Sequence, residues 1–338
     1  MFYAIIILTI KWIGRFVVKV KNLEINGKIA LAPLAGYTNP AYRMLMKEFG
    51  ADLVFSEMIS AKGLLYDNEK TWELTEVEPE EHPLAIQIFG GDIDSMVKAA
   101  MMIDQKTSAD IIDLNMGCPV RKVLKAEGGC QLLTDVNKIE AMVKAIVKNV
   151  QKPVSVKIRA GINQKTINCV EVAKAVERAG ASFITIHGRT QSDMYSGKVN
   201  LDYIKAVKAA VKIPIIGNGD IRSVADAQRM IDQTGVDMIM VGRGSFGNPW
   251  LIRDLKDHFE GRPSQPAPTP EEKIKMCQKH LLMLMAIKPE KIALLEMRSL
   301  AAWYVKGIEH SKDFRQKLNL VSRKEELLSL LDELLTKI

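Results

Sequence analysis

Cysteine is scarce in this sequence, with four residues in a chain of 338. No two of them form a CxxC motif, and their spacing is not that of a metal site. A disulfide-rich secreted scaffold is therefore excluded, and we expect no bound metal. Because cytosolic proteins keep their thiols reduced, we expect a cytoplasmic protein with free cysteines. They are Cys118, Cys130, Cys169 and Cys277.

A long apolar run is missing as well. The one candidate, Phe2–Ile10, is too short to span a bilayer. It also has neither the preceding basic segment nor the small-residue cleavage site of a secretory signal. We expect no membrane contact, and we expect residues 1–20 to be a loosely attached extension, or the natural start to lie near Val17–Val20. The alternative is an interfacial amphipathic segment.

The overall composition is that of a globular protein. Apolar residues make up 47% of the chain and charged residues 26%. The net charge of +7 and the sequence pI of about 9.0 are compatible with a polyanionic partner, although they do not identify one. No composition feature indicates an oligomer, and we expect a monomer.

Short apolar, β-branched runs alternate with amphipathic segments of helical period, which indicates a parallel sheet covered by helices. Eight such runs fit a (β/α)₈ TIM barrel. A doubly wound sheet would also alternate, but it would usually carry a G-x-G-x-x-G turn after its first strand. Here that turn reads APLAG, so we favour the barrel. The eight predicted strands are Ile29–Ala32, Leu53–Phe55, Leu84–Phe89, Ile111–Leu114, Val154–Ile158, Phe183–Ile186, Ile213–Ile216 and Met238–Val241.

The chain after the eighth strand changes character. Phe246–Phe259 is predicted to be helical, and residues 261–270 hold four prolines, which is typical of a linker. Residues 271–338 are predicted to form four or five helices, one of them with a face through Ile292, Leu295, Ser299 and Ala302. The predicted organisation is thus an extension (1–20), a barrel (21–260), a linker (261–270) and an all-helical C-terminal domain (271–338).

The stretch from Ile111 to Gly129 has the clearest chemical signature. An apolar strand turns abruptly into Asn115, Gly117, Cys118 and Pro119. Proline restricts the residue before it to an extended backbone, so this turn holds the thiol on a stiff loop at the rim of the barrel. A buried structural cysteine is the competing interpretation.

Other predicted strands also end in polar or glycine-rich clusters, where barrel enzymes carry their chemistry. Each cluster alone has an ordinary explanation, such as a packed histidine or a turn, but together they indicate a site. The loops after the last two strands suit a phosphate bound by backbone N–H groups, with Arg243 as a charged partner. With Lys157 and Gln87 nearer the mouth, this arrangement suits flavin mononucleotide. The clusters contain Gln87, Lys157, His187, Asn218-Gly219-Asp220 and Gly242-Arg243.

The ordered set of motifs resembles the tRNA-dihydrouridine synthases, and the chain is similar to their bacterial B-type branch from about Ile29 to Tyr304. The motifs are APLAGYTNPAYR, QIFGG, DLNMGCPVRKV, VKIRAG, HGRTQSDMYSG, IPIIGNGDI, MVGRGSFGNPW and MRSLAAWY. The resemblance implies an FMN enzyme that reduces the C5–C6 double bond of uridines in tRNA, with NADPH or NADH as reductant. Two positions depart from the family pattern: Leu34 stands where Met is frequent, and Ser299-Leu300 stands where a basic residue and His often follow Arg298.

The resemblance also assigns roles to residues. It makes Cys118 the proton donor, places Asn115 beside the substrate base, and makes Arg121, Lys122 and Arg298 tRNA contacts. The helical domain would bind tRNA through a basic face, whereas Trp303 and Tyr304 are expected to be core residues. The flavin contacts that it implies are Pro33, Leu34, Ala35, Gln87, Lys157, His187, Asn218, Gly219, Asp220, Gly242 and Arg243.

The expected chemistry needs a thiol that is protonated at neutral pH, which a pKa near 8.5 would give. Arg121 and Lys122 are cations that lower such a pKa when they lie close, so this point is open on sequence alone. Two alternative functions remain. One is an FMN oxidoreductase on a free pyrimidine, of the dihydroorotate dehydrogenase kind, which would not need a basic helical domain. The other is an RNA-binding module without catalysis, which would not take up flavin.

Overall fold

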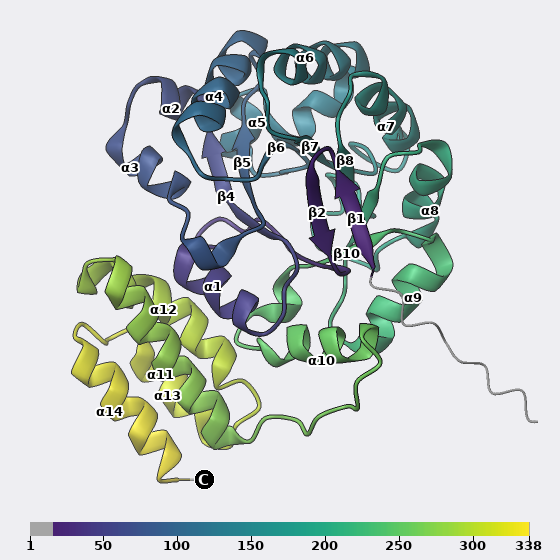
Figure 1. The fold of residues 1–338 in the computed structure, drawn as a ribbon. Coiled ribbons are helices and arrows are strands. Elements are labelled where there is room, and N and C mark those ends of the chain that lie inside the picture. Colours follow the sequence, from purple (N-terminus) through teal and green to yellow (C-terminus); the bar gives the residue numbers. More distant parts are fainter. Residues whose placement is uncertain (1–15, 338) are drawn as a thin grey trace, which may run out of the picture.

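Eight parallel strands form the barrel at the centre of the computed structural model, which describes residues 16–337 (Figure 1). The sheet runs from β3 to β4 through β10, β9, β8, β7, β6 and β5. A parallel bridge between Ala30 and Leu53 joins the two outer strands and closes the barrel. The predicted TIM barrel is confirmed. The strands are β3 (Ile29–Leu31), β4 (Val54–Ser60), β5 (Leu84–Phe89), β6 (Ile111–Met116), β7 (Val154–Arg159), β8 (Phe183–His187), β9 (Ile215–Asn218) and β10 (Met238–Val241).

Several predicted boundaries are wrong, among them that of the second strand, which was expected at Leu53–Phe55 and runs from Val54 to Ser60. Two others are wrong for local reasons. The strand expected at Ile213–Ile216 begins at Ile215, after Pro214, which has no N–H to give to a ladder. The helix expected from Phe246 begins at Trp250. Before it the chain forms a 3₁₀ turn at Arg243–Ser245 and then passes through Gly247, whose φ of +59° no regular helix accepts.

Helices surround the barrel and bury their apolar faces against its strands (Figure 1). Local capping fixes several of their starts. The Asp92 side chain accepts a bond from the N–H of Ser95, and the Ser223 side chain accepts one from the N–H of Asp226. The helices are α1 (Pro40–Glu48), α2 (Ala61–Leu65), α3 (Glu69–Trp72), α4 (Ile93–Lys106), α5 (Arg121–Lys125), α6 (Val136–Asn149), α7 (Cys169–Arg178), α8 (Leu201–Ala210), α9 (Val224–Thr234) and α10 (Trp250–Phe259).

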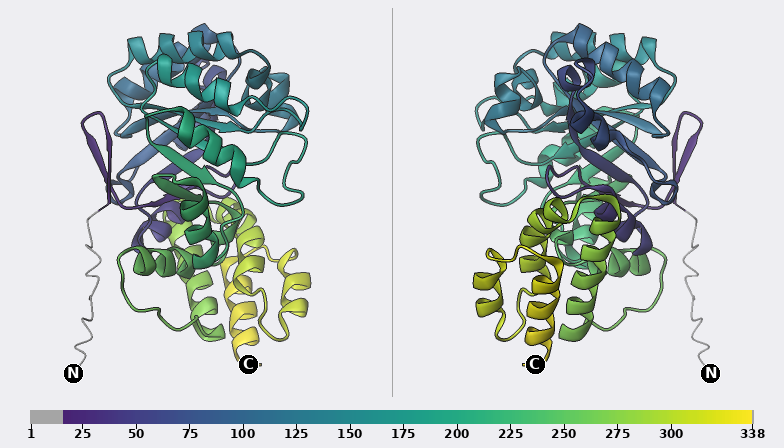
Figure 2. Two further views of the ribbon diagram at one scale, coloured as in Figure 1. Left: turned by 90° about the vertical axis from the view of Figure 1, so that its right-hand side faces the viewer. Right: turned by 90° about the vertical axis from the view of Figure 1, so that its left-hand side faces the viewer.

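An antiparallel hairpin of β1 (Val17–Val20) and β2 (Leu23–Asn26) lies across the amino-terminal end of the barrel (Figure 2). Val20 and Ile25 are buried in one cluster with the barrel interior. The domain boundary predicted after residue 20 is therefore wrong, because it cuts through this hairpin. The prediction for the first fifteen residues lies outside the described residues. In the part that the structure describes, no helix is long and apolar enough to cross a bilayer.

The C-terminal domain contains α11 (Pro270–Ile287), α12 (Glu290–Tyr304), α13 (Ser311–Leu318) and α14 (Lys324–Leu335). Thr269 and Glu272 form a capping box at the start of α11, as the sequence predicts. The domain packs beside α1 of the barrel, through α11 (Figure 2). The predicted face through Ile292 and Leu295 is wrong as a packing face, because these side chains are exposed and the buried side of α12 includes Met297 and Leu300.

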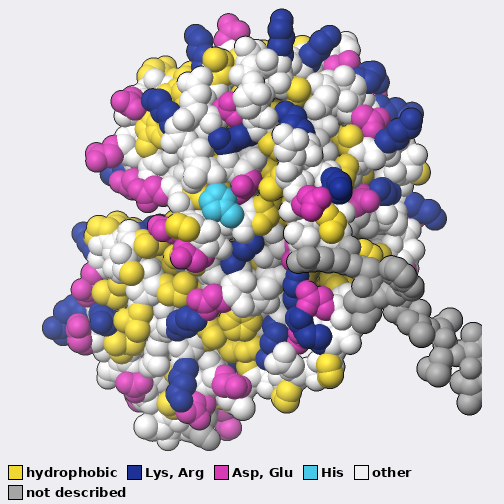
Figure 3. All heavy atoms as spheres, viewed as in Figure 1, with side chains coloured by type: hydrophobic (Ala, Val, Ile, Leu, Met, Phe, Trp, Pro, Cys, Tyr) yellow, Lys and Arg dark blue, Asp and Glu magenta, His cyan; other side chains and the backbone are white. Residues whose placement is uncertain are grey.

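Acidic and basic side chains alternate over the face that carries the hairpin, with no single basic patch there (Figure 3). In the helical domain, several of the lysines and arginines expected to form a basic face are instead paired with acids. Lys288 pairs with Glu296, and Lys317 with Glu333.

Candidate active site

A cavity of about 480 Å³ opens at the carboxyl end of the barrel. Residues from seven of the eight barrel strands, or from the loops that follow them, line it, together with Trp303 from α12. The sequence-predicted residues that it brings together are Pro33, Leu34, Ala35, Asn115, Cys118, Lys157, His187, Asn218, Gly219, Asp220, Gly242 and Arg243.

The Cys118 loop is held from both sides. The Asn115 side-chain oxygen accepts the N–H groups of Gly117 (3.1 Å) and Cys118 (2.9 Å). On the other side, the N–H of Cys130 donates to the carbonyl of Cys118 at 3.0 Å. A Cβ atom at Gly129 would lie 2.4 Å from that carbonyl, so only glycine permits this approach. The sulfur therefore sits on a turn that backbone hydrogen bonds fix in place.

Burial raises the pKa of the Cys118 thiol. A hydrogen bond from the backbone of Val120 and the charges of Arg159 and Lys157 oppose this shift but do not overcome it. Arg121 and Lys122 are exposed on α5 and do not line the cavity. The open question about the thiol is thereby answered, since a raised pKa keeps it protonated at neutral pH.

Gln87 lies beneath the cavity lining rather than in it, fully buried on β5. Its amide nitrogen donates to Asp113 at 2.6 Å, and its oxygen accepts the Asn115 amide at 2.7 Å. The Ser155 hydroxyl donates to the other Asp113 oxygen at 2.5 Å. Because every link has a fixed direction, the Asp113 carboxylate orients Asn115 through Gln87.

Two charged side chains, the half-buried Lys157 and the fully buried Asp113, lie below the mouth. Burial lowers the pKa of Lys157 to about 8, helped by the nearby Arg159. Burial raises the pKa of Asp113 to about 6, against the hydrogen bonds from Gln87 and Ser155. The Lys157 ammonium donates to the side-chain oxygen of Asn218 at 3.2 Å. The lysine is thus a poorly compensated cation aimed at the cavity.

His187, at the end of β8, is neutral. Burial and the surrounding cations Lys157, Arg159, Arg189 and Arg243 lower its pKa well below the usual value. The N–H of Arg189 donates to His187 Nδ1 at 3.2 Å, so the ring proton sits on Nε2. Arg189 itself binds both oxygens of Asp220, at 3.0 and 2.6 Å. Burial works against ionisation of Asp220, but the hydrogen bonds from Arg189 and Val199 hold its pKa below the ordinary value.

The loops after β9 and β10 form a narrow glycine-lined wall. A Cβ atom at Gly219 would lie 2.6 Å from the Val199 side chain, and one at Gly244 would lie 2.3 Å from the carbonyl of Ile221. The Arg243 guanidinium lies 4.2 Å from the centre of the Tyr195 ring, with its side chain partly exposed. The Arg243 guanidinium also lies 3.9 Å from a carboxylate oxygen of Asp220. Close backbone approach and a partly exposed cation are the features that a phosphate group requires.

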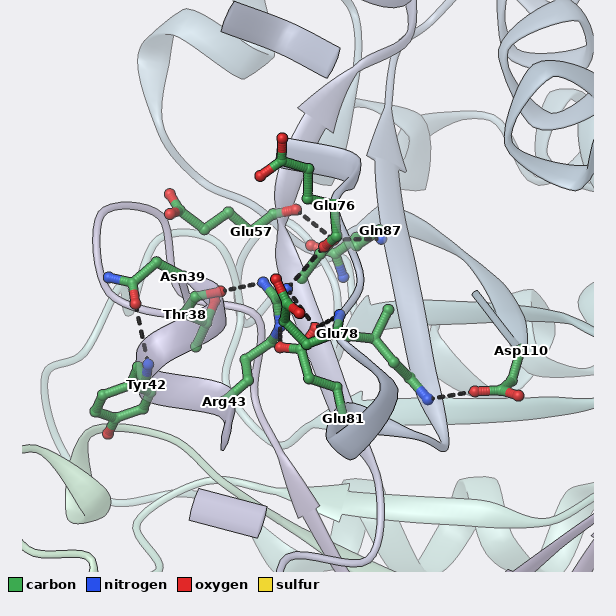
Figure 4. Close-up of polar contacts among 12 residues, drawn as sticks. Thr38, Asn39, Tyr42, Arg43, Glu57, Glu76, Glu78, Glu81, Gln87 and Asp110 are labelled. Atoms are coloured by element: carbon green, nitrogen blue, oxygen red, sulfur yellow. Dashed lines mark hydrogen bonds and ion pairs between the residues drawn. The ribbon is translucent and has the colours of Figure 1, made fainter. Parts of the chain in front are cut away.

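A buried ion pair clamps the loop after β3, which supplies Pro33, Leu34 and Ala35 to the cavity (Figure 4). Arg43 binds both oxygens of Glu81, at 2.6 and 3.1 Å. It also donates to the Thr38 carbonyl at 2.7 Å. The Thr38 hydroxyl accepts the N–H of Leu34 at 3.0 Å, so Thr38 connects the Arg43–Glu81 ion pair to the cavity wall.

The structure places one predicted site residue outside the cavity, and it shows cavity residues that were not predicted from the sequence. Arg298 lies on α12 and donates to the carbonyl of Val321, outside the cavity lining. Arg159, Tyr195, Phe246 and Trp303 line the cavity but were not predicted. Strand alternation could have found Arg159, two residues after Lys157 on the same side of β7. Trp303 is 37% exposed, so its prediction as a core residue is wrong, whereas Tyr304 is buried as expected.

Comparison with known proteins gives a consistent result. The family model described as "Dihydrouridine synthase (Dus)" matches residues 30–338. The tRNA-dihydrouridine synthase B of Pasteurella multocida is 38% identical over 313 residues, covering 92% of this chain and 94% of that protein. A probable tRNA-dihydrouridine synthase of Rickettsia bellii is 35% identical over 306 residues, covering 90% of this chain and 94% of that protein.

Among solved structures, histamine dehydrogenase from Rhizobium sp. 4-9 is similar, with a TM-score of 0.54 and 13% identity. The match covers 80% of this chain, which spans about half (51%) of the length of that structure. At this identity the likeness supports the barrel fold alone.

Proposed function

We propose, from the premise that the chain belongs to the dihydrouridine synthase family, that it reduces the C5–C6 double bond of uridines in tRNA to 5,6-dihydrouridine. The relatives that carry this name match nearly the full chain. One structural observation supports the proposal in addition to the family match: a protonated thiol, Cys118, and a half-buried cation, Lys157, face the same cavity.

The residues of the cavity fit FMN. The cavity volume of about 480 Å³ suits a cofactor of this size. The glycine wall of Gly219 and Gly244, with Gly242 and Arg243 beside it, suits its phosphate, and Lys157 with Asn218 suits the polar edge of its ring. Pro33, Leu34 and Ala35 would cover the remaining edge. When bound, FMN would supply the hydride, taken from NADPH or NADH.

Cys118 would supply the proton. Reduction of the double bond places a proton on C5, and a thiol with a raised pKa holds that proton at neutral pH. Once the proton has left, the Val120 N–H and the charges of Arg159 and Lys157 stabilise the thiolate until it is protonated again. Asn115 fixes the loop that carries the sulfur and would face the base. Neutral His187 would offer its Nε2 proton as a hydrogen-bond donor.

The substrate uridine must leave its stack to enter a cavity in a barrel mouth, as base-modifying enzymes generally require. We propose that the helical domain, residues 270–335, holds the rest of the tRNA, with Arg121 and Lys122 on exposed α5 as phosphate contacts beside the Cys118 loop. Arg298 drops out of this set, because its guanidinium bonds within the domain. Binding through phosphates should weaken steeply as salt rises.

The test is direct. Purified protein loaded with FMN, given NADPH and an unmodified tRNA transcript, should form dihydrouridine that nucleoside mass spectrometry detects. If tRNA stays unmodified while free uridine or dihydroorotate is turned over, the free-pyrimidine oxidoreductase replaces this proposal. The cytoplasmic location and the monomeric state expected from the sequence stay predictions, which cell fractionation and light scattering check.

A further inference from the structure

An aromatic side chain of the helical domain forms part of the cavity wall. Trp303, on the last turn of α12, lines the cavity together with Tyr37 and Phe246 from the barrel. Its side chain is 37% exposed, although other aromatic rings lie beside it. The tryptophan therefore presents part of its ring to whatever occupies the mouth.

The ring is supported from below by the barrel. Phe246 lies 5.6 Å from Trp303, centre to centre, and is itself stacked on Tyr37 at 4.2 Å. Gly247 brings the barrel loop against α12, because a Cβ atom there would lie only 2.5 Å from the Trp303 carbonyl carbon. The tryptophan is thus held at the junction of the two domains and pays little entropy on binding a ligand.

The position of Trp303 relative to the reacting groups follows from the strand order. Its neighbours Tyr37 and Phe246 come from the loops after β3 and β10, which are adjacent in the barrel. Cys118 comes from the loop after β6, on the opposite side of the ring of strands. Trp303 therefore faces the mouth from the side away from the thiol. Lys306, with its ammonium 5.1 Å from the Trp303 ring centre, adds a cation on this side.

We propose that Trp303 is a stacking platform for a second unpaired nucleobase of the RNA, next in sequence to the one that enters the cavity, with Lys306 beside its phosphate. The inference rests on the proposed function and extends it from one nucleotide to two. Stacking of a base on an aromatic side chain tolerates any base, so this subsite adds affinity rather than sequence selectivity. The nicotinamide ring of the reductant is the other flat ligand that could stack on Trp303. The two are told apart because the nicotinamide takes part in flavin reduction and the RNA in flavin reoxidation.

The experiment uses FMN-loaded full-length protein and the variants Trp303→Leu and Trp303→Phe. Trp72→Phe is a matched control, because Lys106 lies 5.1 Å from that ring in the same way but α3 is outside the cavity. Stopped-flow absorbance follows flavin reduction by NADPH without RNA, and then reoxidation of the reduced enzyme by rising concentrations of tRNA. Trp303→Leu should raise the half-saturating tRNA concentration roughly 5- to 100-fold, from the usual stacking energy per base. Trp72→Phe should match the wild type in both half-reactions.

Trp303→Phe should lie between Trp303→Leu and the wild type, and it provides the test if the leucine variant does not load flavin. An unchanged half-saturating tRNA concentration in the phenylalanine and leucine variants would overturn the inference. Slower flavin reduction with unchanged tRNA saturation would overturn it too and assign the platform to the dinucleotide. If the wild type itself is not reoxidised by tRNA, the proposed function fails instead.

Discussion

Replacing Arg43 by methionine tests how the wall of the cavity is built. The Arg43 side chain is 2% exposed and that of Glu81 is fully buried, so the change leaves a carboxylate without its cation in a dry site. It also removes the donors to the carbonyls of Thr38 (2.7 Å) and Glu76 (3.1 Å). Since Thr38 holds Leu34, the loss reaches the loop that would cover the flavin.

The expected magnitude follows from the burial. Breaking a buried ion pair by removing one partner costs about 3–5 kcal/mol, because the other charge stays behind uncompensated. The two orphaned carbonyls add to this cost. Removing both charges, in Arg43→Met with Glu81→Met, should cost much less than the sum of the two single changes. Flavin affinity should fall in Arg43→Met, since the loop of Pro33–Ala35 is released.

Urea unfolding of the flavin-free protein measures the free energies, and flavin fluorescence measures the affinity. Arg178→Met is the matched control, because Arg178 binds both oxygens of Glu140 in a similar forked geometry at the surface. That exposed pair should contribute little to stability. The reasoning is refuted if Arg43→Met unfolds like the wild type, or if the double variant loses the full sum of the single losses.

Two further changes probe the buried charges. The variant Asp113→Asn keeps an oxygen that accepts from the Gln87 amide, and its N–H can donate to the Ser155 hydroxyl. The folded-state pKa of Asp113 is raised from 3.8 to about 6, so the wild type loses stability as pH rises through 6. The variant has no carboxyl group to titrate and should not show this loss. Their free energies of unfolding should diverge by about 2 kcal/mol between pH 4 and pH 7, and a constant difference would contradict the buried carboxylate. Lys157→Met removes a cation whose folded-state pKa is lowered to about 8, so the wild type loses stability as pH falls through 8. At pH 7 the flavin-free variant should be more stable by up to about 3 kcal/mol, yet bind flavin at least about tenfold more weakly; undiminished flavin binding in a fluorescence titration would contradict the role of the cation.

The barrel could be predicted because its strands are buried on both faces and read as continuous apolar runs. The ends of the strands could be predicted as a site because polar or glycine-rich clusters recur after seven of the eight predicted strands. The sequence did not show how deeply a polar side chain lies below the cavity surface, or which groups it bonds to. Gln87 looks like a cavity residue in the sequence, but Asp113 and Asn115 occupy both ends of its amide.

Contacts between distant segments were also invisible in the sequence. Trp303 lies in an apolar helix and was predicted to be core, because no local signal tells that Gly247 of the barrel would draw it to the cavity rim. In the same way, nothing in the sequence indicated that Arg298, predicted as an RNA contact, would donate to the carbonyl of Val321. Residues 17–20 were separated from the barrel because a four-residue strand has too little pattern to identify.

The most direct test of the central claim is a single turnover of reduced, FMN-loaded enzyme with unmodified tRNA. Cys118→Ala should bind flavin and tRNA normally yet form dihydrouridine at least about 100-fold more slowly, the usual contribution of a positioned acid. Cys130→Ala, which changes the neighbouring buried thiol and keeps its backbone bond to the Cys118 loop, should react like the wild type. Equal rates for Cys118→Ala and the wild type would contradict the account.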